Sequence, residues 1–277
     1  MRVTNINYNA VFLIHGMQYI FLSHDVDWRK EGPPIEHILE RKERFDKITI
    51  DNLRSRNPYY NIPDYIAIED KYGVKSTFFF RTIYEGGSLN DYEDDIHSLI
   101  NGGWEIGLHS DPKSVNSLEK LGNEKKQLEL ITKHPITANR VHYLSNDSRL
   151  AFKLQSLGFV YDSSVKKFKD RITKDDLGFY KTGNLIQFPI SLMDAYLFTY
   201  MKIKESQLVA LFEKTLDQCK KMKKDIVTVI WHENVLKMTG GRMYPSILQY
   251  LTSRDDVTIC RGIDLAKMIN QLTIVSS

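Results

Sequence analysis

Short continuous apolar runs alternate along this chain with segments whose apolar residues recur at helical spacing. The runs are rich in β-branched and aromatic residues, a composition typical of buried strands. They predict strands at residues 20–28, 74–81, 104–108, 139–144, 159–161, 185–191, 226–231 and 257–261. The segments between them predict helices at residues 62–72, 91–101, 115–133, 147–157, 205–222, 244–252 and 263–271.

This alternation predicts an α/β fold in which a parallel sheet is covered by helices, because strands that are apolar throughout are buried on both faces. About seven strand–helix steps in one chain favour a distorted (β/α) barrel of about seven parallel strands over an open doubly wound sheet. Reactive side chains recur at the ends of the predicted strands, where a barrel would gather them on one rim. They are Asp25, Asp27, His109, His142, Asp162, Asp194 and His232.

The same pattern indicates one domain over residues 1–277, with a core at about 19–271. No repeat, low-complexity tract or glycine- and serine-rich linker divides the series. Residues 29–63 are polar and contain Pro33-Pro34 and a charged run. We interpret them as an excursion from the core, part helix and part loop, that can cover the site.

Composition narrows the class of protein further. With 42% hydrophobic and 26% charged residues the chain is typical of soluble globular proteins, and a net charge of +3 gives no support for a nucleic-acid surface. Two distant cysteines, Cys219 and Cys260, exclude a disulfide framework and a thiolate zinc site. The apolar stretch at 10–22 is interrupted by polar residues and leads straight into an acidic motif. We therefore expect no signal peptide, no membrane span and a cytoplasmic protein.

The acidic motif is Ser23-His24-Asp25-Val26-Asp27, at the end of the first predicted strand. Side chains alternate along a strand, so Asp25 and Asp27 lie on one face and repel each other unless a cation or a shared proton compensates. The alternative is a strand that ends in an ordinary polar turn, where aspartate is common.

Other kinds of site lack their motifs. The chain has neither a glycine-rich phosphate loop nor a Gly-x-Ser-x-Gly nucleophile elbow. What remains is a set of aspartates and histidines, which suits a divalent metal that activates water.

Six motifs in order resemble the polysaccharide deacetylase family, the carbohydrate esterases with a NodB-like domain. They are Ser23-His24-Asp25-Val26-Asp27, Ser76-Thr77-Phe78-Phe79, Glu105-Ile106-Gly107-Leu108-His109-Ser110, Arg140-Val141-His142-Tyr143, Gly158-Phe159-Val160-Tyr161-Asp162-Ser163 and Val229-Ile230-Trp231-His232. The resemblance runs from about Tyr19 to His232. It implies a distorted barrel of about seven strands and the metal-dependent removal of N-acetyl, sometimes O-acetyl, groups from sugar polymers.

The resemblance also implies roles for single residues. Asp25 would be the general base, held ionised by Arg140, and His232 would protonate the leaving amine. Asp27 and His109 would bind a divalent metal, often zinc in this family.

Three further roles follow from the same motifs. The backbone N–H of Tyr143 would stabilise the oxyanion, and Val229 and Trp231 would line the pocket for the acetyl methyl group. Either Asp162 or Asp194 would orient His232.

One position departs from the family pattern, in which a second histidine follows the first by four residues. Here that position is Lys113, and a protonated lysine cannot bind a metal. His142 can supply the missing ligand, Asp111 can do so in an altered loop, or the metal is weak or absent. Of these we favour His142.

The leading hypothesis is therefore a metal-dependent hydrolase that acts on an acetylated sugar or polysaccharide. A second hypothesis keeps the fold but cleaves a non-sugar C–N bond, with or without a metal. A third is a carbohydrate-binding protein without catalytic activity. The residues leave the identity of the substrate, the metal and the oligomeric state open.

Overall fold

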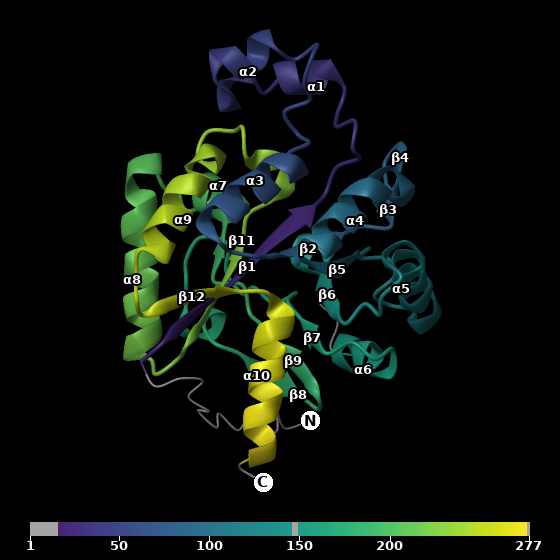
Figure 1. Cartoon of the computed structure of the whole chain (residues 1–277), viewed down its shortest axis with the longest axis vertical. Helices are drawn as coiled ribbons and strands as arrows, with labels where there is room; N and C mark the ends of the chain where they lie inside the picture. Colours follow the sequence, from purple (N-terminus) through teal and green to yellow (C-terminus); the bar gives the residue numbers. More distant parts are fainter. Residues whose placement is uncertain (1–15, 146–148, 276–277) are drawn as a thin grey trace.

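A computed structural model describes residues 16–145 and 149–275 (Figure 1). Its strands are β1 (Gln18–Val26), β2 (Thr77–Phe80), β3 (Ile83–Tyr84), β4 (Gly87–Ser88), β5 (Glu105–Ser110), β6 (Ala138–Val141), β7 (Tyr161–Asp162), β8 (Tyr180–Thr182), β9 (Leu185–Gln187), β10 (Leu192–Met193), β11 (Ile226–Ile230) and β12 (Val257–Cys260). Its α-helices are α1 (Ile35–Leu39), α2 (Lys47–Asp51), α3 (Ile62–Tyr72), α4 (Glu93–Asn101), α5 (Leu118–Thr132), α6 (Leu150–Ser156), α7 (Asp194–Thr199), α8 (Leu208–Lys221), α9 (Tyr244–Thr252) and α10 (Gly262–Val275).

The main sheet is parallel apart from β8, and its strand order is β10-β11-β1-β2-β5-β6-β7-β9-β8. The segment that contains β9 and β10 joins the two sides of this order. Its Ile190 N–H donates to the Val165 carbonyl near β7, and its Ser191 N–H donates to the Thr228 carbonyl of β11. The sheet thus curls into a distorted barrel, which confirms the predicted fold class.

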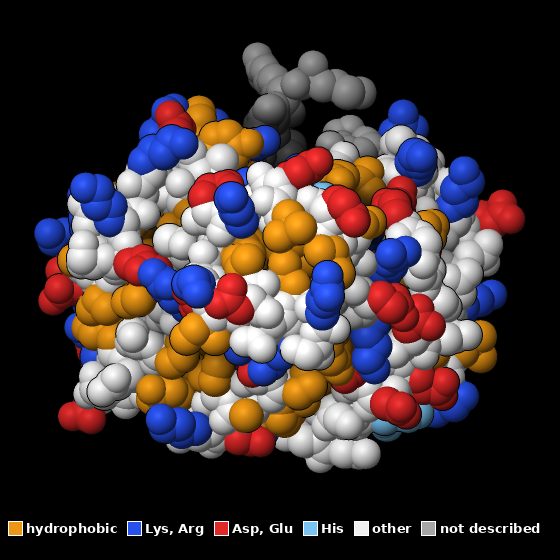
Figure 2. Space-filling view, turned by 90° about the horizontal axis from the view of Figure 1, so that it is seen from above, with side chains coloured by type: hydrophobic (Ala, Val, Ile, Leu, Met, Phe, Trp, Pro, Cys, Tyr) orange, Lys and Arg blue, Asp and Glu red, His pale blue; other side chains and the backbone are white. Residues whose placement is uncertain are grey.

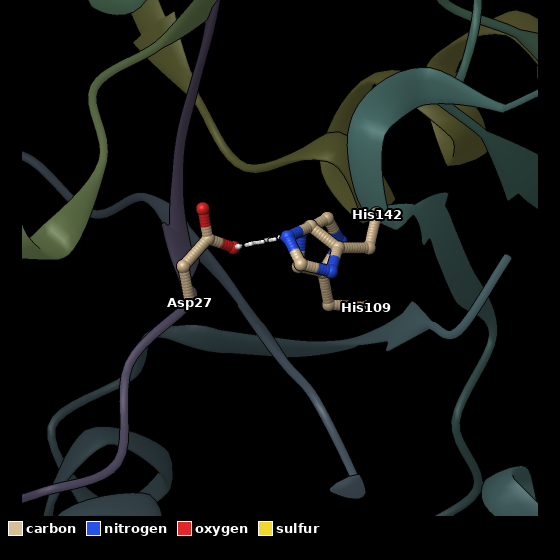
Figure 3. A group of neighbouring side chains, drawn as sticks. All are labelled: Asp27, His109 and His142. Carbon is tan, nitrogen blue, oxygen red and sulfur yellow. Dashed lines mark ion pairs between the residues drawn. The ribbon is translucent and has the colours of Figure 1, made fainter. Parts of the chain in front are cut away.

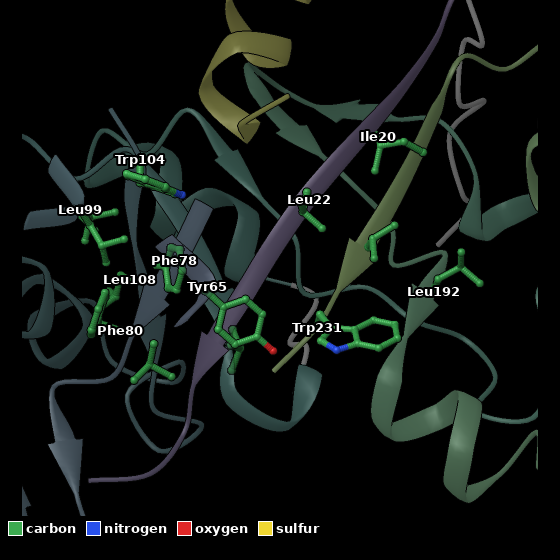
Figure 4. Close-up of a cluster of buried hydrophobic side chains, with 14 of the residues drawn as sticks. Ile20, Leu22, Tyr65, Phe78, Phe80, Leu99, Trp104, Leu108, Leu192 and Trp231 are labelled. Atoms are coloured by element: carbon green, nitrogen blue, oxygen red, sulfur yellow. The ribbon is translucent and has the colours of Figure 1, made fainter. Parts of the chain in front are cut away.

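Alternation along the strands separates two apolar layers. Phe21, Phe79 and Tyr161 point into the barrel, where α10 packs against them at one end. Leu22 and Phe78 belong to the larger cluster between the sheet and its covering helices (Figure 4). The site must therefore be built from the inward set of side chains, at the carboxyl ends of the strands.

Helix α3 was predicted with the bounds that the structure has, Ile62–Tyr72. Pro63 lies in its first turn, where the missing N–H costs no hydrogen bond. Gly73 ends the helix with φ +65°, a conformation that glycine adopts without strain. Its buried face carries Tyr65 and Glu69 toward the sheet.

Several predicted boundaries were wrong. Strand β6 ends at Val141, and residues 142–144 form a tight turn in which Tyr143 and Leu144 have φ of +61° and +53°. The segment between the predicted strands at 159–161 and 185–191, for which no element was predicted, contains β8. Two elements, α7 and the β3–β4 hairpin, have no periodic pattern and were not predicted. The predicted segments at 10–22 and 147–157 lie partly outside the described residues.

Residues 29–63 contain α1 and α2 and rise beyond the carboxyl end of β1 (Figure 1). A small separate cluster anchors them, made of Ile38, Phe45, Tyr59 and Met238. From this end the surface shows apolar side chains between charged ones of both signs (Figure 2). None of the helices that the structure describes has the length and apolar character needed to span a bilayer.

Candidate active site

Three side chains from three strand ends meet at the rim of the barrel: Asp27, His109 and His142 (Figure 3). The Oδ1 atom of Asp27 lies 3.1 Å from His109 Nε2 and 3.7 Å from His142 Nε2. Their potential ligand atoms all lie within 4.8 Å of one another. Because β1, β5 and β6 run parallel, their carboxyl ends meet on the same rim.

The atoms of this cluster fit a divalent cation. His109 Nδ1 lies 3.0 Å from the Arg140 carbonyl, so Nδ1 carries the proton and Nε2 turns its lone pair toward Asp27. Asp27 Oδ1 is buried and has no hydrogen-bond partner among the described residues. Two acceptors face each other across 3.1 Å, an arrangement that needs a cation or a second proton between them.

The electrostatics of the cluster agree with this. Burial opposes the ionisation of Asp27, but contact with His109 and the charge of His232 hold the pKa of Asp27 well below its usual range. Burial lowers the pKa of His142 to about 4, which keeps its imidazole neutral, the form that binds metals. His142 Nδ1 has no partner in the part of the chain that the structure describes.

Asp25 lies beside this cluster, on the same face of β1 as Asp27. Its Oδ1 accepts a 2.6 Å hydrogen bond from Arg140 Nη1, and its Oδ2 lies 3.7 Å from His109 Nε2. The guanidinium of Arg140 is fully buried, donates to the carbonyl and hydroxyl of Ser163, and lies over the Phe79 ring. Burial opposes the ionisation of Asp25, but Arg140, His109 and His232 together outweigh it and lower the pKa of that carboxyl.

His232 approaches the cluster from the opposite side of Asp27, with its Nε2 3.7 Å from Asp27 Oδ2. Asp194 orients this imidazole through a 2.5 Å contact with Nδ1 and a 2.6 Å hydrogen bond from the His232 backbone N–H. Although burial opposes protonation, Asp194 raises the pKa of His232 to about 10. Asp162 was the other candidate for this orienting role, and its carboxylate instead accepts hydrogen bonds from Asn139 and Ser164.

Tyr143 stands at the mouth of the site. Its ring is 81% exposed and stacks on His142 at 3.8 Å between centroids. Its positive φ turns the backbone sharply where β6 ends. A non-glycine residue in this conformation is uncommon and recurs at functional sites.

Two predicted residues do not reach the site. Val229 and Trp231 belong to the cluster between the sheet and the helices. Figure 4 shows Trp231 there, and its indole donates to the Gly241 carbonyl. The inward residue of this strand is Ile230, which packs with Ile190 and Met193. Alternation along the strand is the signal that identifies Ile230, because it lies two positions before His232 on the same face.

Lys113 stays out of the cluster. It is exposed, and its backbone N–H donates to Asp111 Oδ1 within a short turn. Glu124 of α5 holds that turn by accepting hydrogen bonds from the Asp111 N–H and the Ser114 hydroxyl. These contacts fix the loop in a conformation that holds residue 113 outside the cluster of Asp27, His109 and His142.

No protein-family model matches the sequence, and no curated protein matches it. Solved structures do resemble it. A protein from Mycobacterium smegmatis that is named as a polysaccharide deacetylase has a TM-score of 0.67 at 16% identity, over 93% of this chain and 92% of that one. One of the same name from Pseudomonas aeruginosa PAO1 has a TM-score of 0.67 at 13% identity, over 93% and 92%. The Puue allantoinase has a TM-score of 0.67 at 13% identity, over 91% and 90%. The chain therefore has the NodB-like fold of the polysaccharide deacetylases.

Proposed function

We propose that this protein is a metal-dependent hydrolase that removes N-acetyl groups from a sugar or polysaccharide. The observation that carries this proposal is the arrangement around Asp27. A candidate metal site has an ionised carboxylate, Asp25, on one side and an imidazole oriented by a carboxylate, His232, on the other. Amide hydrolysis needs an activated water, a stabilised oxyanion and a protonated leaving group, and this arrangement can supply all three.

Asp27, His109 and His142 would hold the metal, with zinc the first candidate because one carboxylate and two imidazoles are ligands it favours. A divalent cation at this position lowers the pKa of water and polarises the acyl carbonyl. The three residues fit this role through the neutral imidazole of His142, the tautomer of His109 fixed by the Arg140 carbonyl, and the Asp27 oxygen that has no hydrogen-bond partner among the described residues.

Asp25 would accept the proton of the attacking water. The Arg140 contact keeps this carboxylate ionised and leaves its Oδ2 turned toward His109 and the metal ligands. Arg140 is itself fixed by Ser163 and Phe79, so the base is held in one orientation before substrate binds.

His232 would give a proton to the nitrogen of the departing amine, since it is held in the protonated form by Asp194. The backbone N–H of Tyr143 would donate to the oxyanion, a contribution typically worth about 3 kcal/mol. Ile190, Met193 and Ile230 form a small buried apolar cluster next to Asp194, which would lie behind the methyl of a bound acetyl group.

The experiment measures acetate released from N-acetylated chitooligosaccharides by the zinc-loaded protein. Asp25→Asn and His232→Ala should each reduce turnover by roughly 10²- to 10⁴-fold, the usual contribution of a general base or acid. His134→Ala is the matched control, because that histidine is exposed and lies in no motif. Acetate release that survives both active-site changes would overturn the proposal.

A second candidate is hydrolysis of a non-sugar C–N bond. The fold likeness to an allantoinase favours it, because its TM-score equals those of the two deacetylases. Ureide substrates tested beside the chitooligosaccharides separate the two. Ureide hydrolysis that depends on Asp25 and His232, without acetate release, would establish the second candidate. Sugar binding without hydrolysis of either substrate would indicate a carbohydrate-binding protein.

A further inference from the structure

A buried polar cluster lies on the helix side of the sheet, behind the residues proposed to act on the substrate. Its centre is the contact between His24 Nε2 and Glu69 Oε1 at 2.7 Å, and both side chains are fully buried. His24 comes from β1 and Glu69 from α3. The mechanism proposed above uses neither residue, so the cluster needs its own explanation.

Glu69 is saturated with donors. Its Oε1 accepts from His24, the Ser76 hydroxyl at 3.0 Å and the Tyr244 hydroxyl at 2.6 Å. Its Oε2 accepts from the Trp104 indole at 2.6 Å. Three of these donors, the Ser76 and Tyr244 hydroxyls and the Trp104 indole, do not depend on the protonation of His24, and together they make Glu69 an acceptor, as a carboxylate is.

Both ring nitrogens of His24 face acceptors. Nε2 faces the Glu69 carboxylate and lies 3.2 Å from the Tyr244 hydroxyl oxygen, whose own proton goes to Glu69. Nδ1 lies 2.6 Å from the backbone carbonyl of Trp231. Each nitrogen must therefore carry a proton, which makes His24 an imidazolium that neutralises Glu69. The rings of Tyr65 and Phe78, with centroids at 4.3 and 4.6 Å, surround this cation with aromatic faces and edges.

The carbonyl that His24 binds lies at the point where two strands stop pairing. Backbone pairing between β1 and β11 ends at Ser23 and Ile230, followed by one hydrogen bond from the Trp231 N–H to the Ser23 carbonyl. The His24 side chain adds a further link beyond it. The next residues along the two strands are Asp25 and His232.

We propose that His24 is a positioning residue, whose imidazolium locks the end of β1 to the end of β11 and so fixes the general base and the general acid relative to each other. The roles of Asp25 as general base and of His232 as general acid rest on the proposed function. The hydrogen bonds that carry the positioning proposal do not depend on the substrate.

The protonation state is tested first on the wild-type, metal-free protein. Nitrogen NMR of histidine-labelled protein at neutral pH should show protons on both ring nitrogens of His24. An unprotonated Nδ1 or Nε2 at neutral pH would overturn the proposal without any variant or activity.

Variants then test the link to the site. His24→Leu combined with Glu69→Gln removes both charges together, so neither is left buried without a partner. In this double variant the Nδ1–H signal of His232, which reports its bond to Asp194, should shift. Ser76→Ala is the matched control, because it removes one donor from the same Glu69 oxygen and leaves His24 in place. A His232 signal unchanged in the double variant contradicts the positioning role.

Kinetics separate positioning from a merely structural role. The folded double variant should lose roughly ten- to a hundredfold in kcat with little change in KM, because misplaced groups slow the chemical step. Ser76→Ala should retain the wild-type kcat. Wild-type kcat in the double variant would overturn the proposal. If no acetate is released by the wild type while the NMR signatures hold, the proposed function fails and the imidazolium link stands.

Discussion

His142 Nε2 lies 3.7 Å from Asp27 Oδ1, although two strands, β2 and β5, separate the strands that carry these residues. The tight turn after β6 makes this approach possible, because it ends the strand at Val141 and brings His142 over the rim. The ligand that the sequence lacks at Lys113 would thereby come from a different strand.

Replacement of His142 by alanine should therefore abolish stoichiometric binding of zinc or cobalt. Lys113→His should neither increase metal affinity in the wild type nor rescue His142→Ala, because Glu124 and Asp111 hold residue 113 away from the cluster. Calorimetric titration of the metal-free variants checks both statements. Metal binding that survives in His142→Ala but rises in Lys113→His would contradict this ligand set.

Asp194→Asn should reduce kcat by at least about tenfold, because the imidazole of His232 loses the carboxylate that fixes its tautomer and its proton. Asp162→Asn is the control, since Asp162 bonds only Asn139 and Ser164 within its own network. Steady-state acetate release from the same chitooligosaccharide measures both variants. Equal losses in the two would argue against a specific role for Asp194.

Substitutions of Ile230 and Val229, which are neighbours on β11, should have different effects on acyl preference. Ile230→Ala leaves space in the buried apolar cluster next to His232 and should shift preference from acetyl toward larger acyl groups by roughly 10-fold or more. Val229→Ala, on the outer face of the strand, should cost roughly 1 kcal/mol of stability and leave acyl preference unchanged. Competition between N-acetyl and N-propionyl substrates tests the difference. A shift in preference with Val229→Ala would mean that the faces are assigned wrongly.

Glu105 supplies a prediction about pH and stability. It accepts hydrogen bonds from Thr77 and from the Ile263 N–H at the start of α10, yet burial raises its pKa from 4.5 to about 7. A raised pKa means that the folded state binds the proton more tightly. The stabilisation that protonated Glu105 gives to the folded state is complete below pH 4.5 and is lost as the pH rises through about 7.

Between pH 4.5 and 8, the free energy of unfolding of Glu105→Gln should therefore rise relative to that of the wild type, by on the order of 3 kcal/mol. Urea unfolding across this range measures the difference. Glu213→Gln, at an exposed position of α8, should give a difference that does not change with pH. A constant difference for Glu105→Gln would show that this carboxyl titrates normally.

Much of the fold follows from local patterns. The alternation of apolar runs and helical segments was enough to predict the barrel. Helices α3 and α9 have the predicted bounds because the apolar face of each helix and the residues at its ends indicate the same range. The gathering of Asp25, Asp27, His109 and His232 follows from parallel strands that end on one rim.

The remaining features depend on tertiary contacts that leave little trace in the sequence. The turn at Tyr143 and Leu144 uses positive φ without glycine, so no turn motif announces it. The loop at Lys113 takes its conformation from Glu124, a residue on another element. Trp231 was predicted to line the pocket from its motif, although strand alternation places it on the outer face.

The metal dependence of acetate release is the central claim, and one measurement tests it most directly. Acetate release from an N-acetylated chitooligosaccharide is followed before chelation, after chelation, and after one equivalent of zinc is returned. We expect activity to be lost on chelation and restored by zinc in the wild type, but not in Asp27→Ala, which lacks the shared ligand. Undiminished acetate release from the chelated wild type, with its metal content shown to be zero, would contradict the claim.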